Sequence, residues 1–552
     1  MKKQVLFTIL IVLPLVAMAD DSGKCGASLT WTYTEATKTL TISGTGEMTD
    51  YDYSNFSNYS PWHSYSDDIV KVSIGEGVTS IGDAAFVDCT SLTSIQIPNS
   101  VTSIGEGAFS GCTGLNSVTI GNSVTSIGYS AFFSCTRLTS ISIPNSVTSI
   151  GRGAFSWCTG LTSVTIGNSV TYIGTDAFSD CSNLKQLTFY CKEVSEWFDY
   201  DYKSNIQQVF IGESVKTIGY NAFNGFTGLT SVTIPNSVTN IGDWAFSGCS
   251  SLTSIEIPNS VTSIGERAFE ACKRLASITI PRSVTEIGYS VFRGCSSMTS
   301  ITVDPENMVY DSRENCNGII ESETNTLIQG CKNTIIPDGV VSIGRDAFSE
   351  CTGLTSIILP SSIKSINDAF YGCTKLSKVV ISDLEAYCKI IFSRTYVDSE
   401  TCLPLYYAKH LFLNDEEIKD LVIPTNTTTI QDNLFRYCDG IESIELHKDI
   451  TKISGYAFSD CNNIQKIVLF AKRPSSFTSG YNPFTTNVYN NCTLYVPEGS
   501  ENAYYVADGW KNFKKIETFK EQQPEKVPQD VNGDGVVDTQ DVLEIYKYIQ
   551  EH

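Results

Sequence analysis

The sequence has few histidines, few positive charges and no long apolar run beyond its first residues. Only 4 of 552 residues are histidine, and 38 Lys and Arg stand against 60 Asp and Glu, which gives a formal charge of -22. A field of that sign repels phosphate backbones, so we expect no nucleic-acid partner. After Val16 no stretch approaches the roughly 20 apolar residues that a spanning helix needs, so we expect no membrane span.

Groups that could carry out catalysis are also sparse. None of the histidines has a Ser, Cys or carboxylate at a sequence spacing that is typical of a catalytic motif. The four are His63, His410, His447 and His552. Charged residues make up 18% of the chain, and Ser, Thr, Asn and Gly dominate the polar remainder, as is typical of strands and turns. Because catalysis needs several groups that converge in one concave site, we predict that the chain is not an enzyme.

The first residues predict export. Lys2 and Lys3 precede an apolar stretch from Val5 to Val16, and Ala17-Met18-Ala19 supplies the small-x-small pattern of a cleavage site. A buried, uncleaved segment is the alternative. We expect residues 1–19 to be a signal peptide and the mature chain to be extracellular or on a bacterial cell surface.

A repeat with a period of 23 residues fills most of the chain. IGDAAFVDCTSLTSIQIPNSVTS is followed directly by IGEGAFSGCTGLNSVTIGNSVTS. The aromatic position returns in register at Phe86, Phe109, Phe132, Phe155, Phe178, Phe223, Phe246, Phe269, Phe292, Phe348, Phe370, Phe435 and Phe458. A fixed period of this length is typical of a solenoid, whose units bury their apolar faces against their neighbours. We expect the aromatic rings to stack from coil to coil.

Each unit contains one strand with a buried and an exposed side. The segment LTSIEIP at residues 252–258 has the L-x-x-L-x-L spacing of leucine-rich repeats. Ile255 and Ile257 are two residues apart and point inward, so Ser254 between them points outward. Gly265 is expected to permit the bend that returns the chain to the core.

A cysteine follows each aromatic position by three residues. The set is Cys89, Cys112, Cys135, Cys158, Cys181, Cys249, Cys272, Cys295, Cys351, Cys373, Cys438 and Cys461. Export favours disulfides, and the spacing of roughly 4.8 Å between adjacent strands would permit them. Phe226 replaces the cysteine in one unit, however, so the position requires apolar volume. We favour buried free thiols over disulfides and over a metal site, for which paired CxxC ligands are lacking.

The outward strand positions and the interruptions of the repeat are the candidate binding surfaces. The outward positions are Ser94, Gln96, Ser117, Thr119, Ser140, Ser142, Ser163, Thr165, Ser231, Thr233, Ser277 and Thr279. They form either a plain solvated face or a surface for broad contact with a polymer. The register is interrupted near residues 182–215, 301–335 and 374–424. The candidate ligand contacts in the first interruption are Tyr190, Trp197, Phe198, Tyr200 and Tyr202, which could instead only fill an irregular coil.

The phrases IPNSVTSIGEGAFSGCTGL and IPNSVTNIGDWAFSGCSSL resemble the BspA-like leucine-rich-repeat family of bacterial surface and secreted proteins. The resemblance extends from about Cys25 to Thr518. It implies an α/β-type repeat, a leucine-rich-repeat solenoid made mostly of strands and turns. It also implies an N-terminal cap at residues 20–68, a solenoid at 69–470 and a C-terminal cap at 471–519.

The C-terminus has the spacing of a calcium-binding loop. After a linker at residues 520–529, the expected ligands of one calcium ion are Asp530, Asn532, Asp534, Val536, Asp538 and Asp541. An acidic tail without a site is the alternative. With one helix after the loop, residues 530–552 resemble a single repeat of a type I dockerin. In that family two repeats pack together to bind cohesin modules. Because only one repeat is found here, the resemblance leaves a cohesin-like partner possible but does not imply the full contact.

We therefore predict a monomeric, exported binding protein that contacts host or matrix protein or glycan through the solenoid face or its insertions. The alternative is a non-catalytic component of a carbohydrate-processing surface assembly, docked through the calcium repeat. A structural spacer at the cell surface remains a third possibility.

Overall fold

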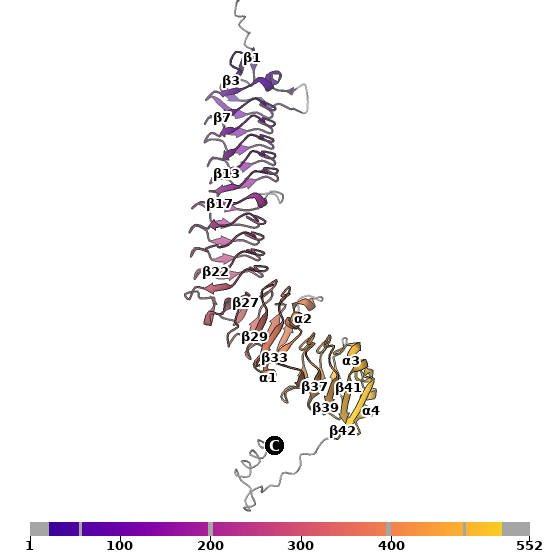
Figure 1. Cartoon of the computed structure of the whole chain (residues 1–552). Helices are drawn as coiled ribbons and strands as arrows, with labels where there is room; N and C mark the ends of the chain where they lie inside the picture. The colour runs from indigo at the N-terminus through magenta and orange to yellow at the C-terminus, as the bar shows by residue number, and fades with distance from the viewer. Residues whose placement is uncertain (1–20, 54–57, 197–202, 394–398, 479–481, 521–552) are drawn as a thin grey trace, which may run out of the picture. The chain divides into compact units, whose positions relative to one another are not determined.

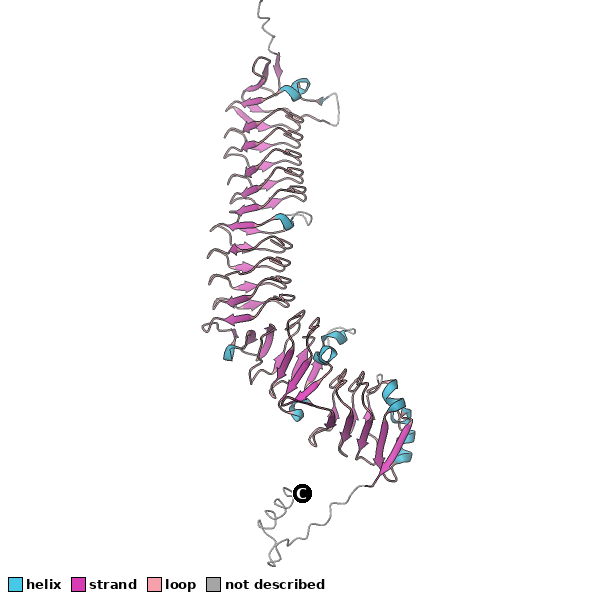
Figure 2. Cartoon of the chain, viewed as in Figure 1, coloured by secondary structure: helices cyan, strands magenta, loops and turns pink. Residues whose placement is uncertain are grey.

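The computed structural model describes residues 21–53, 58–196, 203–393, 399–478 and 482–520. The chain forms two compact units. The first contains Met1–Thr355, Asn367–Leu376 and Thr395–Cys402, and the second contains Ser356–Ile366, Ser377–Arg394 and Leu403–His552. Within each unit the coils follow one another in sequence order (Figure 1). The fold is a leucine-rich-repeat β-solenoid, because equivalent strands of successive coils pair in parallel. It has little helix, and no described helix exceeds six residues (Figure 2).

One strand per coil builds a first row of parallel strands in the first unit. The row runs through β3 (Thr39–Gly44), β5 (Lys71–Ile74), β7 (Ser94–Gln96), β9 (Ser117–Thr119), β11 (Ser140–Ser142), β13 (Ser163–Ile166), β15 (Gln186–Phe189), β17 (Gln208–Ile211), β19 (Val232–Thr233), β22 (Ser277–Ile280) and β24 (Ser300–Val303). Ser140 pairs with Ser163, which pairs in turn with Gln186. The predicted strand at residues 252–258 contributes only one bridge, from Ser254 to Ser231.

A second row of short parallel strands forms on the return path of the coils. Its members are β4 (Gly46–Glu47), β6 (Val78–Ile81), β8 (Ser103–Ile104), β10 (Ser126–Ile127), β12 (Ser149–Ile150), β14 (Tyr172–Ile173), β16 (Glu193–Val194), β18 (Thr217–Ile218), β20 (Asn240–Ile241), β21 (Ser263–Ile264) and β23 (Glu286–Ile287). Ile127 pairs with Ile104 and Ile150, and all three are buried. The inward position of this segment was predicted, but its pairing into a second row was not.

The core contains the predicted column of aromatic rings. Phe109 and Phe132 are both buried, and their ring centroids lie 5.1 Å apart with planes 5° from parallel. The stack continues to Phe155 at 5.2 Å and Phe178 at 5.4 Å. Each ring therefore fills the space between its neighbours, which makes the coils mutually dependent.

The cysteines form a ladder of free thiols, as predicted. All 19 are free, and all but Cys351 and Cys402 are buried. The thiol of Cys112 donates to the carbonyl oxygen of Phe86 at 3.1 Å, one coil back, and equivalent bonds recur along the stack. Burial raises the pKa of Cys272 to about 12, so the thiol keeps its proton at neutral pH and remains a donor. The thiols that make these bonds each satisfy a buried carbonyl that the neighbouring coil leaves open.

The expected role of Gly265 in bending the chain is wrong. The left-handed residue of that turn is Arg267, with φ of 53°. A Cβ on Gly265 would lie 2.4 Å from the backbone nitrogen of Asp243 in the preceding coil. Glycine is needed there because two coils approach closely, not because the backbone turns left-handed.

The N-terminal end of the first unit is an antiparallel sheet that leads into the parallel row. β1 (Asp21–Lys24) pairs with β2 (Leu29–Thr34), which pairs antiparallel with β3, and β3 then pairs parallel with β5. Trp62 precedes the 3-10 helix η2 (His63–Asp68) and is fully buried. Its ring stacks on Phe86 at 5.7 Å, and its Nε1 donates to the Ala85 carbonyl at 2.8 Å. Trp62 thus occupies the first position of the aromatic column.

Two of the three predicted interruptions lie wholly in the first unit, and the third, near residues 374–424, is divided between the two units. Around residues 182–215 the rows continue through β15, β16 and β17, joined by the short helix η3 (Lys203–Asn205). Around residues 301–335 the antiparallel strands β25 (Tyr310–Asp311), β26 (Gly318–Glu321) and β27 (Thr326–Gly330) form a small meander beside helix η4 (Arg313–Asn315). β27 then pairs parallel with β28 (Ser342–Ile343).

The second unit repeats the same construction with more irregular coils. Its first-row and terminal strands are β29 (Ser356–Leu359), β31 (Lys378–Ile381), β33 (Leu411–Leu413), β34 (Glu416–Glu417), β35 (Asp420–Val422), β37 (Ser443–Leu446), β39 (Lys466–Leu469), β41 (Thr493–Pro497) and β42 (Lys515–Phe519). The other strands in this part of the chain are β30 (Ser365–Asn367), β32 (Ile391–Ser393), β36 (Thr429–Ile430), β38 (Lys452–Ile453) and β40 (Ser476–Phe477). The helices of the second unit are α1 (Leu384–Tyr387), α2 (Pro404–Ala408), α3 (Thr486–Asn491), α4 (Glu501–Val506) and η6 (Trp510–Asn512), whereas η5 (Ser399–Cys402) belongs to the first unit.

The aromatic column of the second unit ends among other aromatic side chains. Phe458 stacks on Phe484 at 5.4 Å, and Phe484 contacts Phe513 at 5.6 Å. Trp510 is fully buried, and its Nε1 donates to the Ser475 carbonyl at 2.8 Å. These side chains shield the last coil from solvent.

Candidate functional site

The outward side of the first row, from β7 to β24, is named here the strand face. Its side chains are exposed or half-buried, as the alternation of inward and outward residues predicted. Every outward position carries a hydroxyl or an amide except Phe210 and Glu256. Within the row, strands such as β13 and β15 pair with parallel neighbours on both sides, so their backbone groups are occupied and their side chains are what they present to a partner.

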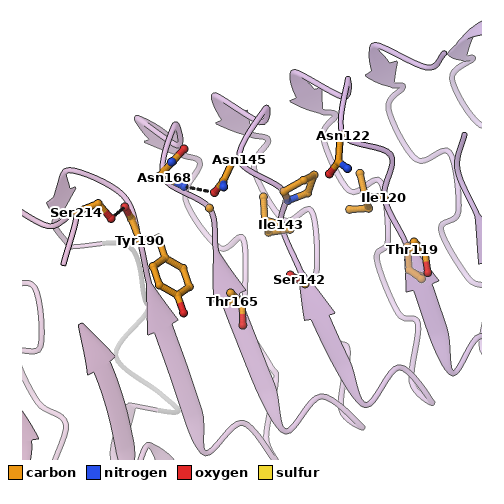
Figure 3. A pocket seen from close by; sticks show the side chains of 13 residues that line it. Thr119, Ile120, Asn122, Ser142, Ile143, Asn145, Thr165, Asn168, Tyr190 and Ser214 are labelled. Carbon is orange, nitrogen blue, oxygen red and sulfur yellow. Dashed lines mark hydrogen bonds between the residues drawn. The ribbon is translucent and has the colours of Figure 1, made fainter. Parts of the chain in front are cut away.

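A groove of about 540 Å³ lies on the strand face, across β9, β11 and β13 (Figure 3). Three hydroxyl side chains line it at equivalent positions of successive coils, and they are Thr119, Ser142 and Thr165. The buried or half-buried side chains of Ile120, Ile143 and Pro144 supply an apolar part of the lining. The strand spacing makes the three-coil width of the groove roughly 10–15 Å.

A row of asparagines borders the groove where the strands turn. Figure 3 shows Asn122, Asn145 and Asn168 at equivalent places on successive coils. The side-chain oxygen of Asn145 accepts the backbone N–H of Asn168 at 2.9 Å, and Asn99 accepts that of Asn122 at 2.8 Å. Because these bonds fix the oxygen of each accepting amide, its NH₂ group is presented as a donor at the exposed edge.

Tyr190 lies at one end of the groove, directly after β15. Its backbone N–H donates to the Ile166 carbonyl at 2.9 Å, and the Ser214 hydroxyl donates to the Tyr190 carbonyl. Its ring makes an edge-to-face contact with the ring of Phe210, and the two ring centroids lie 6.1 Å apart. A Cβ on Gly212 would lie 2.4 Å from the Tyr190 ring carbon Cδ1. The ring is therefore held in place by its neighbours, yet 39% of the residue is exposed.

A second cavity of about 470 Å³ adjoins the same irregular coil. Asn168 lines both cavities, and the second is otherwise lined by Ser169, Val170, Thr171, Lys192, Glu193 and Ser195. Unlike the first, it carries charged side chains. The sequence singled out Tyr190 in this region but missed the asparagine row, because a recurring Asn after a strand reads as a turn residue.

The other predicted site residues fall outside the described residues. They are the aromatic residues Trp197, Phe198, Tyr200 and Tyr202 and the calcium-loop residues Asp530, Asn532, Asp534, Val536, Asp538 and Asp541. Their roles remain predictions. Within the residues that the structure does describe, no group of three or more His, Cys, Asp or Glu side chains is placed to hold a metal ion. No helix in the same ranges has the length and apolar character needed to cross a membrane.

Comparison with known proteins gives one family and several solved structures. The model of the BspA type leucine rich repeat region matches six copies over residues 62–185, 195–319, 319–402 and 407–505. A leucine-rich repeat protein from Bacteroides ovatus ATCC 8483 is 22% identical, with a TM-score of 0.35, over 89% of this chain and 98% of that chain. A leucine rich cell surface protein from Faecalibacterium prausnitzii A2-165 is 24% identical, with a TM-score of 0.32, over 84% and 97%. No curated protein matches the chain.

Proposed function

We propose, from the premise that this chain belongs to the family of BspA-type leucine-rich-repeat proteins, that it is an exported binding protein without catalytic activity. It acts at the cell surface or outside the cell through adhesin-like contact with a host or matrix protein or a glycan. In this proposal a leader at residues 1–19 precedes an N-terminal cap at 20–68, the solenoid at 69–470 and a C-terminal cap at 471–519.

The strand face is the observation that carries this proposal. It presents repeated hydroxyl and amide side chains over many coils, and part of it forms the groove beside Tyr190. Such a surface offers many weak hydrogen bonds of the same kind, which suits an extended partner better than a compact one. It offers few of the Trp, Tyr and Arg anchors that dominate tight interfaces between globular proteins.

A comparison of the mature chain, residues 20–552, with a version that ends at residue 519 tests the proposal. The shorter version keeps β42, the last described strand. Both are probed against arrayed matrix proteins, glycans and bacterial surface extracts, with calcium or with a chelator. We expect both to bind the same matrix or glycan target regardless of calcium. Binding to bacterial extract alone, lost on truncation or chelation, would contradict adhesion.

The second candidate function depends on the C-terminal repeat. The oxygen-bearing residues between Asp530 and Asp541 follow the spacing of a calcium loop, and we propose that they hold one calcium ion. A module of this kind would attach the chain to a cohesin-like partner in a carbohydrate-processing surface assembly. Calorimetric titration of the mature chain with calcium tests it, with Asp534→Ala as the variant expected to lose the binding heat. Equal heat from the variant would exclude this loop.

A further inference from the structure

We infer that the groove beside Tyr190 binds a segment of an uncharged, extended polysaccharide, with the Tyr190 ring against the C–H face of one sugar. This inference rests on the proposed function and names the ligand class of its site. The groove volume of about 540 Å³ falls in the range of small-ligand sites, roughly 300–1,000 Å³.

The lining indicates a neutral ligand. None of the residues that line the groove is Asp, Glu, Lys or Arg, although the whole chain carries a formal charge of -22. Lys192 and Glu193, two charged residues of the irregular coil, line the second cavity instead. A charged ligand would meet no counter-charge in the groove, and an anionic ligand would also be repelled by the net charge of the chain.

The hydrogen-bonding groups match a ligand that is rich in hydroxyls. Thr119, Ser142 and Thr165 carry hydroxyls that both donate and accept, and Asn145, whose oxygen accepts from Asn168, has its NH₂ group left as a donor at the other border. These groups repeat at the strand spacing of about 4.8 Å, which favours a ligand that also repeats. A polysaccharide has both properties.

The geometry favours a polysaccharide over a peptide strand. A peptide that adds to a sheet needs an edge with unpaired backbone groups. The groove instead lies over the face of the row, across β9, β11 and β13, and β13 is paired on both sides, with β11 and with β15. A ligand on this face meets mainly side chains.

The end of the groove is prepared for stacking. The Tyr190 ring rests against Gly212 and meets the edge of Phe210, so little conformational freedom is lost when a ligand covers it. An aromatic face of this kind makes apolar contact while the ring hydroxyl remains available for hydrogen bonding.

Affinity electrophoresis of the mature chain tests the inference. The gels contain one of three neutral polysaccharides (a mixed-linkage β-glucan, a xyloglucan or a galactomannan), heparin as a charged glycan, or no additive. We expect retardation by at least one neutral polysaccharide, unchanged by added salt, and none by heparin. Tyr190→Ala is expected to weaken binding about tenfold. Gly212→Ala, which displaces the ring, is expected to weaken it in the same direction.

The matched control is Tyr172→Ala, which removes an exposed tyrosine from β14 in the second row and is expected to bind as wild type. Thermal melting of each variant confirms that the solenoid is intact. Retardation by heparin alone, by no polysaccharide, or equally for wild type and an intact Tyr190→Ala variant would overturn the inference. Binding of matrix protein that survives Tyr190→Ala would leave the proposed function standing and exclude only this groove.

Discussion

Single residues decide how closely successive coils approach. Gly128 lies where a Cβ would be 2.6 Å from the backbone carbon of Gly105 in the preceding coil. Six residues later, Ser134 adopts a left-handed φ of 57°, a conformation that glycine adopts without steric cost and that Gly111 has at the equivalent position. At position 128 a side chain is excluded by the preceding coil, whereas at position 134 a side chain fits and only the backbone conformation favours glycine.

We predict that Gly128→Ala lowers the free energy of unfolding by about 2–3 kcal/mol, because the added methyl group forces two coils apart. Ser134→Gly serves as the matched substitution. It is expected to leave stability unchanged or to raise it by up to about 1 kcal/mol, since relief of the left-handed strain competes with greater freedom of the unfolded chain. Urea unfolding of both variants measures this. Equal destabilisation by the two changes would contradict the account.

At the scale of elements, the ladder of thiols joins neighbouring coils through buried hydrogen bonds. Cys272 donates to the carbonyl of Phe246 at 3.2 Å, and Cys461 to that of Phe435 at 2.9 Å. Burial raises the pKa of Cys272 and of Cys438 to about 12. The same thiols in the unfolded chain have a pKa of about 8.5.

We predict that stability falls as the pH rises above about 8.5. Between that value and about 12 the unfolded chain loses its thiol protons while the folded chain keeps them, so the unfolded state binds fewer protons and is favoured. Each such thiol contributes roughly 1.4 kcal/mol per pH unit, and below about pH 8 the ladder adds no pH dependence. Urea unfolding at pH 7, 9 and 10 measures the slope. Cys272→Ala is expected to reduce it by the share of one thiol, and an unchanged slope would contradict the ladder.

The first row could be predicted from the sequence because apolar residues alternate with polar ones in most coils, as in β22, where Ile278 and Ile280 are buried and Ser277 and Thr279 are exposed. The second row could not, because a strand such as Ser126–Ile127 is too short for any alternation to register. It exists because the coils stack, so its cause lies in residues one period away. The groove was missed for the same reason: Asn122, Asn145 and Asn168 form one border only after the coils are superposed.

At the scale of the whole molecule, the free energy of unfolding is approximately the sum of the intrinsic stabilities of the coils and of the interfaces between neighbouring coils. The ends are protected by aromatic side chains, with Trp62 at the start of one column and Trp510 beside the end of the other. A substitution at one end should therefore destabilise mainly the coils next to it.

We predict that Trp62→Ala raises hydrogen exchange in β5, β7 and β9 and leaves β22 and β24 unchanged. The substitution removes a fully buried ring from the first coil, and the cost of roughly 3–5 kcal/mol falls on the coils that contact it. Exchange followed by mass spectrometry resolves these segments. A uniform loss of protection along the first unit would show that the solenoid unfolds as one block.

The most direct test of the account is a binding measurement with variants of the two faces of the first unit. Thr119→Arg and Thr279→Arg together add bulk and charge to the strand face, where both residues are exposed. Tyr172→Arg and Glu286→Arg likewise place two arginines on the exposed side of the second row. Against the matrix or glycan target that the mature chain binds, we predict that the first pair abolishes binding and the second leaves it intact. Loss of binding with the second pair alone would contradict recognition by the strand face.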